Sequence, residues 1–140
     1  MNDDAMRKHY LAVLTGAVAG MCVLAGVLAL PSREACSAPA QISYKEDVLP
    51  IFRGRCFSCH QPGGEGFEKS GLDLTTYQGL MKGTKFGPMV IAGDPDASNL
   101  MWLLDWRATP ALRMPHGKKQ LSSCDRDTIR TWILQGAKDN

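Results

Sequence analysis

The residues Cys56-Phe57-Ser58-Cys59-His60 constrain this chain most, because they place two thiols and an imidazole within one short segment. The spacing C-x-x-C-H is typical of a site where haem is attached covalently. Two thiols at this spacing can form thioether bonds to the two vinyl groups of one porphyrin. The histidine that follows can then bind the iron from one face. We therefore expect Cys56 and Cys59 to hold one haem c and His60 to be its proximal ligand.

Two other kinds of site also use a C-x-x-C pair. Structural zinc needs two further ligands, usually from a second close pair. The remaining cysteines, Cys22, Cys36 and Cys124, are scattered singly. A thioredoxin-like redox site lies in a βαβ pattern, and the sequence shows no such pattern nearby. The sequence therefore favours haem attachment over both alternatives.

The N-terminal part of the chain predicts a membrane anchor. Residues 11–30 form an unbroken run without charge, and a helix of that length spans roughly 30 Å, the thickness of a bilayer hydrocarbon core. Arg7 and Lys8 precede the run, so the positive-inside rule places residues 1–10 in the cytoplasm. Residues 31–41 are rich in Pro, Ser and Ala and read as a linker.

A signal peptide is the alternative for this segment. Ala38-Pro39-Ala40 fits an A-x-A cleavage site, but the apolar region of a signal peptide usually has only about 7–15 residues. The length favours a retained single-pass anchor in a bacterial cytoplasmic membrane, with the haem domain in the periplasm. Gly16 and Gly20 form a G-x-x-x-G pair that suits packing against a partner helix. A disulfide between Cys36 and Cys124 is compatible with this location.

The remaining chain, residues 42–140, reads as an all-α domain of short helices and long loops. A capping box that starts at Ser43 predicts a helix towards Arg55. Pro50 is expected to kink this helix. The sequence GGEG at 63–66 predicts a flexible loop directly after the haem motif.

Three further helices are predicted. The Thr75-Thr76 pair is the expected cap of a short helix through residues 80–82. Asp94 is the expected cap of the next helix, with Pro95 at its first position. Residues 100–106 of that helix are apolar nearly all round, so we expect it to be largely buried.

The last helix follows a long loop and is expected to start at Ser122 or Ser123. Its apolar residues recur at i, i+3 and i+4, which predicts one buried face. These residues are Ile129, Trp132 and Ile133. Gly136 is expected to end the helix.

This order of segments resembles the small monohaem cytochrome c fold. The domain is similar to planctomycete-type cytochrome c domains in the successive blocks YKEDVLPIFRGRCFSCH, SGLDLTTYQGLMKG, GPMVIAGDPDASNLMWLL, RMPHGKKQLS and IRTWILQGA. The resemblance covers about residues 42–137. It implies thioether links at Cys56 and Cys59, His60 as proximal ligand, and Met114 of the M-P-x-G block as distal ligand. The family commonly has Met-Pro-Pro where this chain has Met114-Pro115-His116.

The residues themselves leave the distal ligand open among three side chains. Met114 lies in a loop before a proline, so it can face the iron without breaking a helix. His116 and Met89 are lesser candidates, the latter in a loop after Gly87-Pro88. Met81 and Met101 are expected to fill the core. A methionine ligand would raise the reduction potential relative to a second histidine.

We expect an electron carrier rather than an enzyme, because a haem ligated on both faces leaves no position for substrate. The expected donor is a quinol-oxidising complex or a dehydrogenase, and the expected acceptor is a terminal oxidase or a photosynthetic reaction centre. The protein would act as a tethered carrier or as a subunit of a respiratory or photosynthetic complex. The alternatives are a gas-binding or peroxidatic haem protein with a labile distal ligand, and a scaffold subunit of a membrane complex.

Charge gives a weaker indication of the partners. The formal net charge of +2 does not indicate nucleic acid. A basic rim around the haem edge would steer an acidic redox partner. Its candidate residues are Arg53, Arg55, Lys82, Lys85, Lys118 and Lys119.

Overall fold

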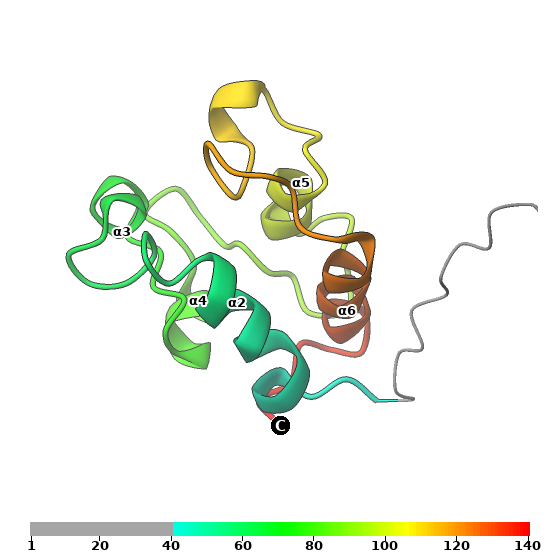
Figure 1. Ribbon diagram of the computed structural model, residues 1–140. Coiled ribbons are helices and arrows are strands. Elements are labelled where there is room, and N and C mark those ends of the chain that lie inside the picture. Colours follow the sequence, from blue (N-terminus) through cyan, green and yellow to red (C-terminus); the bar gives the residue numbers. More distant parts are fainter. Residues whose placement is uncertain (1–40) are drawn as a thin grey trace, which may run out of the picture. The chain divides into compact units, whose positions relative to one another are not determined.

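A computed structural model describes residues 41–140, and all regular elements in this part of the chain are helical (Figure 1). The elements are the π-helical turn η1 (Tyr44–Val48), α2 (Leu49–Arg55), α3 (Glu65–Ser70), α4 (Tyr77–Lys82), α5 (Asn99–Leu104), the 3-10 turn η2 (Pro110–Leu112) and α6 (Ser123–Leu134). The predicted all-α class is confirmed for these residues.

The predicted anchor at 11–30 lies outside the described residues, as do Gly16, Gly20 and Cys36. Within residues 41–140, no helix has both the length and the apolar character that crossing a membrane requires. Cys124 takes part in a disulfide.

The first helix begins where the sequence predicts. Ser43 is the N-cap, and its hydroxyl accepts the N–H of Glu46 at 3.2 Å. The return bond differs from the predicted capping box, because the Asp47 carboxylate accepts the Ser43 N–H at 2.7 Å. The helix changes from π to α at Leu49, and Pro50 lies in the first turn of α2. A proline at that position removes no hydrogen bond from the α-helix.

The predicted loop at 63–66 is wrong in its second half, because Glu65 and Gly66 form the start of α3. The Phe67 N–H in the first turn of α3 donates to the carbonyl of Cys59 at 2.9 Å. Lys69 also pairs with Glu65 across one turn at 2.6 Å. The glycines around this helix give little helix propensity, so a contact from the preceding turn helps to fix its start.

Helix α5 begins later than predicted. The Asp94 carboxylate accepts two backbone N–H groups at 2.9 and 3.1 Å, but these bonds close a separate turn. The N-cap of α5 is Ser98, whose buried hydroxyl accepts the Ile91 N–H at 2.9 Å and donates to the Asp94 carbonyl at 2.7 Å. Trp102 is 44% exposed, so the helix is buried on one side and not nearly all round.

The other two predicted helices are confirmed. The Thr76 hydroxyl caps α4 by accepting the Gly79 N–H at 3.0 Å. The Ser122 hydroxyl caps α6 by accepting the Asp125 N–H at 3.0 Å. The predicted inner face of α6 is fully buried; its residues are Ile129, Trp132 and Ile133.

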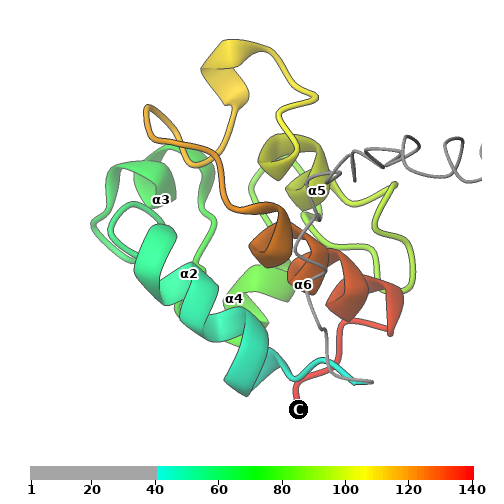
Figure 2. The same cartoon turned by 45° about the vertical axis from the view of Figure 1, so that its right-hand side comes forward.

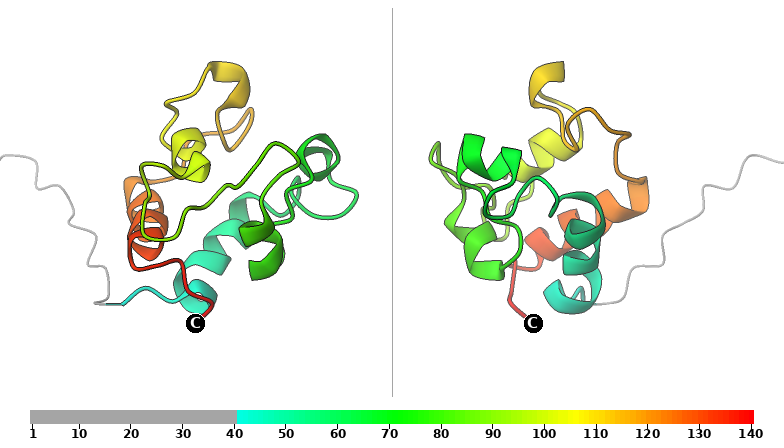
Figure 3. Two further views of the ribbon diagram at one scale, coloured as in Figure 1. Left: turned by 180° about the vertical axis from the view of Figure 1, so that it is seen from behind. Right: turned by 60° about the vertical axis from the view of Figure 1, so that its left-hand side comes forward.

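The two ends of the described chain meet beside an aromatic cluster. The Tyr44 ring lies 5.2 Å from the Tyr77 ring and 5.4 Å from the Trp132 ring, measured between centroids. The Tyr44 N–H donates to the side chain of Asn140 at 2.9 Å. Figures 1 and 3 show the C-terminus next to the start of η1. This closure holds the first helix against α6, with which η1 is in contact.

Helices α5 and α6 also lie together (Figure 3), and Asp105 at the end of α5 links them. Its carboxylate contacts Arg126 at 3.2 Å and also pairs with Arg130. The Asp105 side chain is only 18% exposed. Removing its charge would leave two guanidinium groups without their principal partner.

We expect Asp105→Asn to lower the free energy of unfolding by about 1–3 kcal/mol, since the two arginines lose a half-buried carboxylate. Urea denaturation followed by circular dichroism measures this loss. Asp139→Asn is the matched control, because Asp139 makes one exposed contact with Lys45 at 3.8 Å. Equal stability of the two variants would contradict the assigned role of Asp105.

Candidate haem-binding site

The C-x-x-C-H motif forms a tight turn directly after α2. The carbonyl of Cys56 accepts the N–H groups of Cys59 at 3.1 Å and of His60 at 3.0 Å. The Cys56 N–H donates to the carbonyl of Phe52, a core residue, at 2.8 Å. Both thiols of the motif are free. The turn therefore presents two available thiols and an imidazole on a segment that is anchored in the core.

The chemical state of Cys56 distinguishes between the uses of such a motif. Burial raises the pKa of the Cys56 thiol to about 11, although the charges of Arg55 and Lys118 oppose this shift. Redox and zinc sites depend on a thiolate, which forms at a lowered pKa. Residues 41–140 also contain no group of three His, Cys, Asp or Glu side chains that could hold a metal ion. This environment suits a neutral thiol better than a thiolate site.

The imidazole of His60 is partly buried and has few polar contacts. Burial lowers the pKa of its imidazole, and a contact with the Leu72 backbone that falls short of normal hydrogen-bond geometry partly opposes the shift. The Nδ1 atom is buried and makes no hydrogen bond. A neutral imidazole is the form that binds a metal ion. The three motif residues thus fit a covalently held haem.

Two glycines pack closely against the motif. A Cβ on Gly66 would lie 2.8 Å from Cε1 and 2.9 Å from Nε2 of His60. A Cβ on Gly64 would lie 2.5 Å from the carbonyl oxygen of Cys59. Neither position can carry a larger side chain unless α3 or the motif moves. The absence of side chains at these glycines therefore sets how near α3 lies to His60.

Met114 lies in the long connection between α5 and α6. Its side chain is half-buried and packs against the hydrophobic core. The Met114 N–H donates to the carbonyl of Leu103 at 3.1 Å. The Met114 carbonyl accepts the indole N–H of Trp106 at 2.9 Å. The backbone of this methionine is therefore fixed to the end of α5.

The connection that carries Met114 also reaches the haem motif. The Arg55 guanidinium, at the end of α2, donates to the carbonyl of Lys119 at 2.8 Å, and the charge of Lys118 acts on the Cys56 thiol. Lys69 holds the pKa of the Glu65 carboxyl below its usual range, and His116 adds a smaller effect. Figure 2 shows the connection, coloured yellow to orange, turning back towards α3. Residues 116–119 therefore lie near the start of the motif and near Glu65 of α3.

The other methionines occupy different surroundings. Met89 is 6% exposed and Met101 is fully buried, both within the hydrophobic core. Met81 is partly buried and packs against the same core. His116 is exposed. Of the three candidates for distal ligand, Met114 and His116 thus share the connection next to the motif, whereas Met89 does not.

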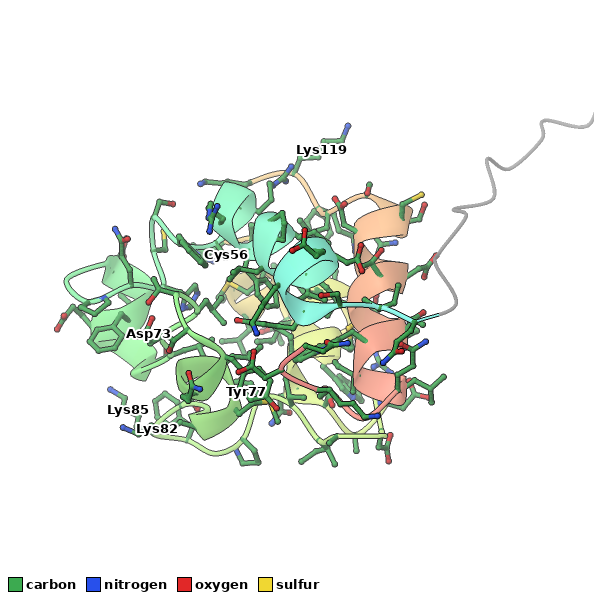
Figure 4. The ribbon with its side chains drawn as sticks, turned by 90° about the horizontal axis from the view of Figure 1, so that it is seen from below. Cys56, Asp73, Tyr77, Lys82, Lys85 and Lys119 are labelled. Carbon is green, nitrogen blue, oxygen red and sulfur yellow. The ribbon has the colours of Figure 1, made fainter. Side chains whose placement is uncertain are left out.

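The predicted basic rim around a haem edge stays a prediction, and its candidate residues lie in different parts of the domain. Lys119 and Lys118 gather with Arg55 beside the motif. Figure 4 shows Lys82 and Lys85 at the opposite edge of the molecule from Lys119. The Lys85 N–H donates to the carbonyl of Ser70 at the end of α3 at 2.9 Å, so this second basic group lies beside α3.

Sequence reasoning missed two residues of the site, Gly66 and Trp106. The Gly66 position is signalled only by a glycine close after the motif, which the sequence reading assigns to a flexible loop. Nothing in the sequence pattern distinguishes Trp106 from a core tryptophan.

Comparison with known proteins agrees with this geometry. Residues 56–116 match the family model described as Planctomycete cytochrome C. The match runs from the first motif thiol to the residue that follows Met114-Pro115. No curated protein and no solved structure matches the chain. The match supports a haem-binding, electron-transfer role, and it shows that the chain contains a planctomycete-type cytochrome c domain.

Proposed function

We propose that this protein carries electrons through one covalent haem c with His60 and Met114 as axial ligands. The observation that supports the proposal most directly is the path of the connection between α5 and α6. Within this connection, the backbone of Met114 is hydrogen-bonded to the end of α5, and the carbonyl of Lys119 accepts a hydrogen bond from Arg55, next to the first thiol. The methionine and the motif therefore belong to one structural unit.

Each of the four proposed haem-binding residues has a separate role. A bound haem supplies one-electron chemistry at its iron. Cys56 and Cys59 would hold it by thioether bonds, and His60 would bind from the motif side. The Met114 thioether would bind from the other side, and a soft ligand of this kind favours ferrous iron and raises the potential. Two fixed protein ligands leave no place for a substrate, which suits a carrier.

The proposal includes a location for the haem domain. The uncharged run at 11–30 would hold the domain at the periplasmic face of a bacterial membrane. There it would exchange electrons with a quinol-oxidising complex or dehydrogenase and with a terminal oxidase or reaction centre. The basic group of Arg55, Lys118 and Lys119 would favour an acidic surface on the partner.

We expect Met114→Ala to abolish the weak near-infrared band that methionine–iron ligation gives in ferric c-type haem, and to lower the reduction potential. His116→Ala should leave both unchanged. Absorption spectroscopy and redox titration of the haem-loaded protein measure these effects. If only His116→Ala alters the spectrum, the distal ligand is His116. A high-spin spectrum of the unmodified protein that shifts with carbon monoxide would instead favour the gas-binding or peroxidatic alternative.

We expect Gly66→Ala to disturb the proximal side, because its new Cβ would overlap the His60 ring. The ferric electron paramagnetic resonance spectrum should change, and less haem should be attached per chain. Gly54→Ala is the matched control, since a Cβ at Gly54 meets no atom within 4 Å. Identical spectra for both variants would show that the close approach of α3 does not position His60.

We expect the full chain to stay in the membrane fraction after an alkaline wash, with its N-terminal segment still present by mass spectrometry. Deletion of residues 11–30 should abolish this retention. Recovery of a soluble periplasmic protein that lacks the segment would show that it is a cleaved signal peptide.

A further inference from the structure

The backbone of Trp106 is unusual. Its φ of +59° lies in the left-handed region, which bulky side chains rarely adopt. Ala137 is the only other non-glycine residue within residues 41–140 that has a positive φ. Strain of this kind persists where surrounding contacts enforce it, and it concentrates at functional sites. The contacts of Trp106 therefore indicate which part of the structure depends on this left-handed conformation.

Those contacts lead to Met114. The Trp106 indole N–H donates to the Met114 carbonyl at 2.9 Å. The Trp106 backbone N–H donates to the carbonyl of Leu103 at 3.3 Å, and the Met114 N–H donates to that same carbonyl at 3.1 Å. Both polar backbone groups of Met114 are thus bound to the segment that Trp106 terminates. The left-handed turn directs the indole back to the methionine.

Arg113, the residue before Met114, also contacts the Trp106 side chain. The Arg113 guanidinium lies 5.5 Å from the centre of the Trp106 ring. Its Nε also donates to the carbonyl of Ala108 at 3.4 Å. Trp106 therefore contacts two consecutive residues of the connection, one through its ring and one through its N–H group.

Trp102, which lies within α5, offers a comparison. Its indole N–H also donates to a backbone carbonyl, that of Asp96, at 3.1 Å. The Arg107 guanidinium lies 4.5 Å from the centre of its ring. The two tryptophans thus make the same kinds of contact, but the indole hydrogen bond and the ring contact of Trp102 involve Asp96 and Arg107 and not Met114 or Arg113. An effect on Met114 that is seen for Trp106 and not for Trp102 is therefore attributed to the hydrogen bond from the Trp106 indole to the Met114 carbonyl.

We propose that Trp106 is a positioning residue, which holds the Met114 backbone so that the thioether keeps its place as an axial ligand. The inference rests on the proposed role of Met114. The indole hydrogen bond opposes the movement that would withdraw the methionine, so its loss should make Met114 easier to replace by another ligand.

The test is competition by imidazole for the ferric iron of the haem-loaded protein, followed by loss of the methionine–iron band. Trp106→Phe keeps an aromatic ring but removes the N–H group. Loss of one hydrogen bond predicts displacement at about fivefold lower imidazole concentration. Trp102→Phe should require the same concentration as the unmodified protein. Equal displacement of Met114 in all three proteins would overturn the inference and leave the proposed ligation intact.

A second measurement needs no substitution at Trp106. Hydrogen exchange of the indole N–H groups, followed by nuclear magnetic resonance in the reduced protein, should speed up at Trp106 in Met114→Ala and stay unchanged at Trp102. Coupling between two sites is reciprocal, so an unaltered Trp106 rate would overturn the inference even if Trp106→Phe fails to fold. Absence of the methionine–iron band from the unmodified protein would overturn both the proposed ligation and this inference.

Discussion

The carboxylate of Asp105 fixes the end of α5, and the candidate distal side is built on that end. Asp105 contacts Arg126 and Arg130 of α6, so the two helices share a half-buried charge cluster. The last carbonyls of any helix lack partners inside the helix. Here the Leu103 carbonyl accepts the Met114 N–H, and the Leu104 carbonyl accepts the side-chain amide of Gln120 at 2.9 Å. The connection that carries Met114 is therefore attached to a helix end which α6 holds in place.

On the candidate proximal side, main-chain hydrogen bonds also fix the segment that carries the ligand. The Cys56 carbonyl closes the motif turn, and the Cys59 carbonyl accepts the N–H of Phe67 in α3. Helix α3 can lie this close because Gly66 has no side chain beside the His60 ring. The Arg55–Lys119 hydrogen bond then joins the motif to the connection from α5. Main-chain hydrogen bonds thus hold the backbone of both candidate axial ligands, His60 and Met114.

The sequence predicted what depends on neighbours along the chain. The caps at Thr76 and Ser122, the buried face of α6 and the haem motif are local patterns, and the structure contains all of them. Helix α3 was missed because a contact from Cys59 helps to fix its start despite its glycines. The start of α5 was misplaced because Ser98 bonds to Ile91, which belongs to the preceding loop. These contacts depend on how segments fold together, so no pattern within one segment predicts them.

The choice between an electron carrier and a haem protein with an open site depends on how firmly Met114 is held. A thioether is a soft ligand that binds ferric iron weakly, so its retention depends strongly on the backbone that presents it. Met114 has both backbone groups bonded, whereas His116 lies beyond the buried Pro115 and is exposed. These backbone contacts support the proposed ligation by Met114.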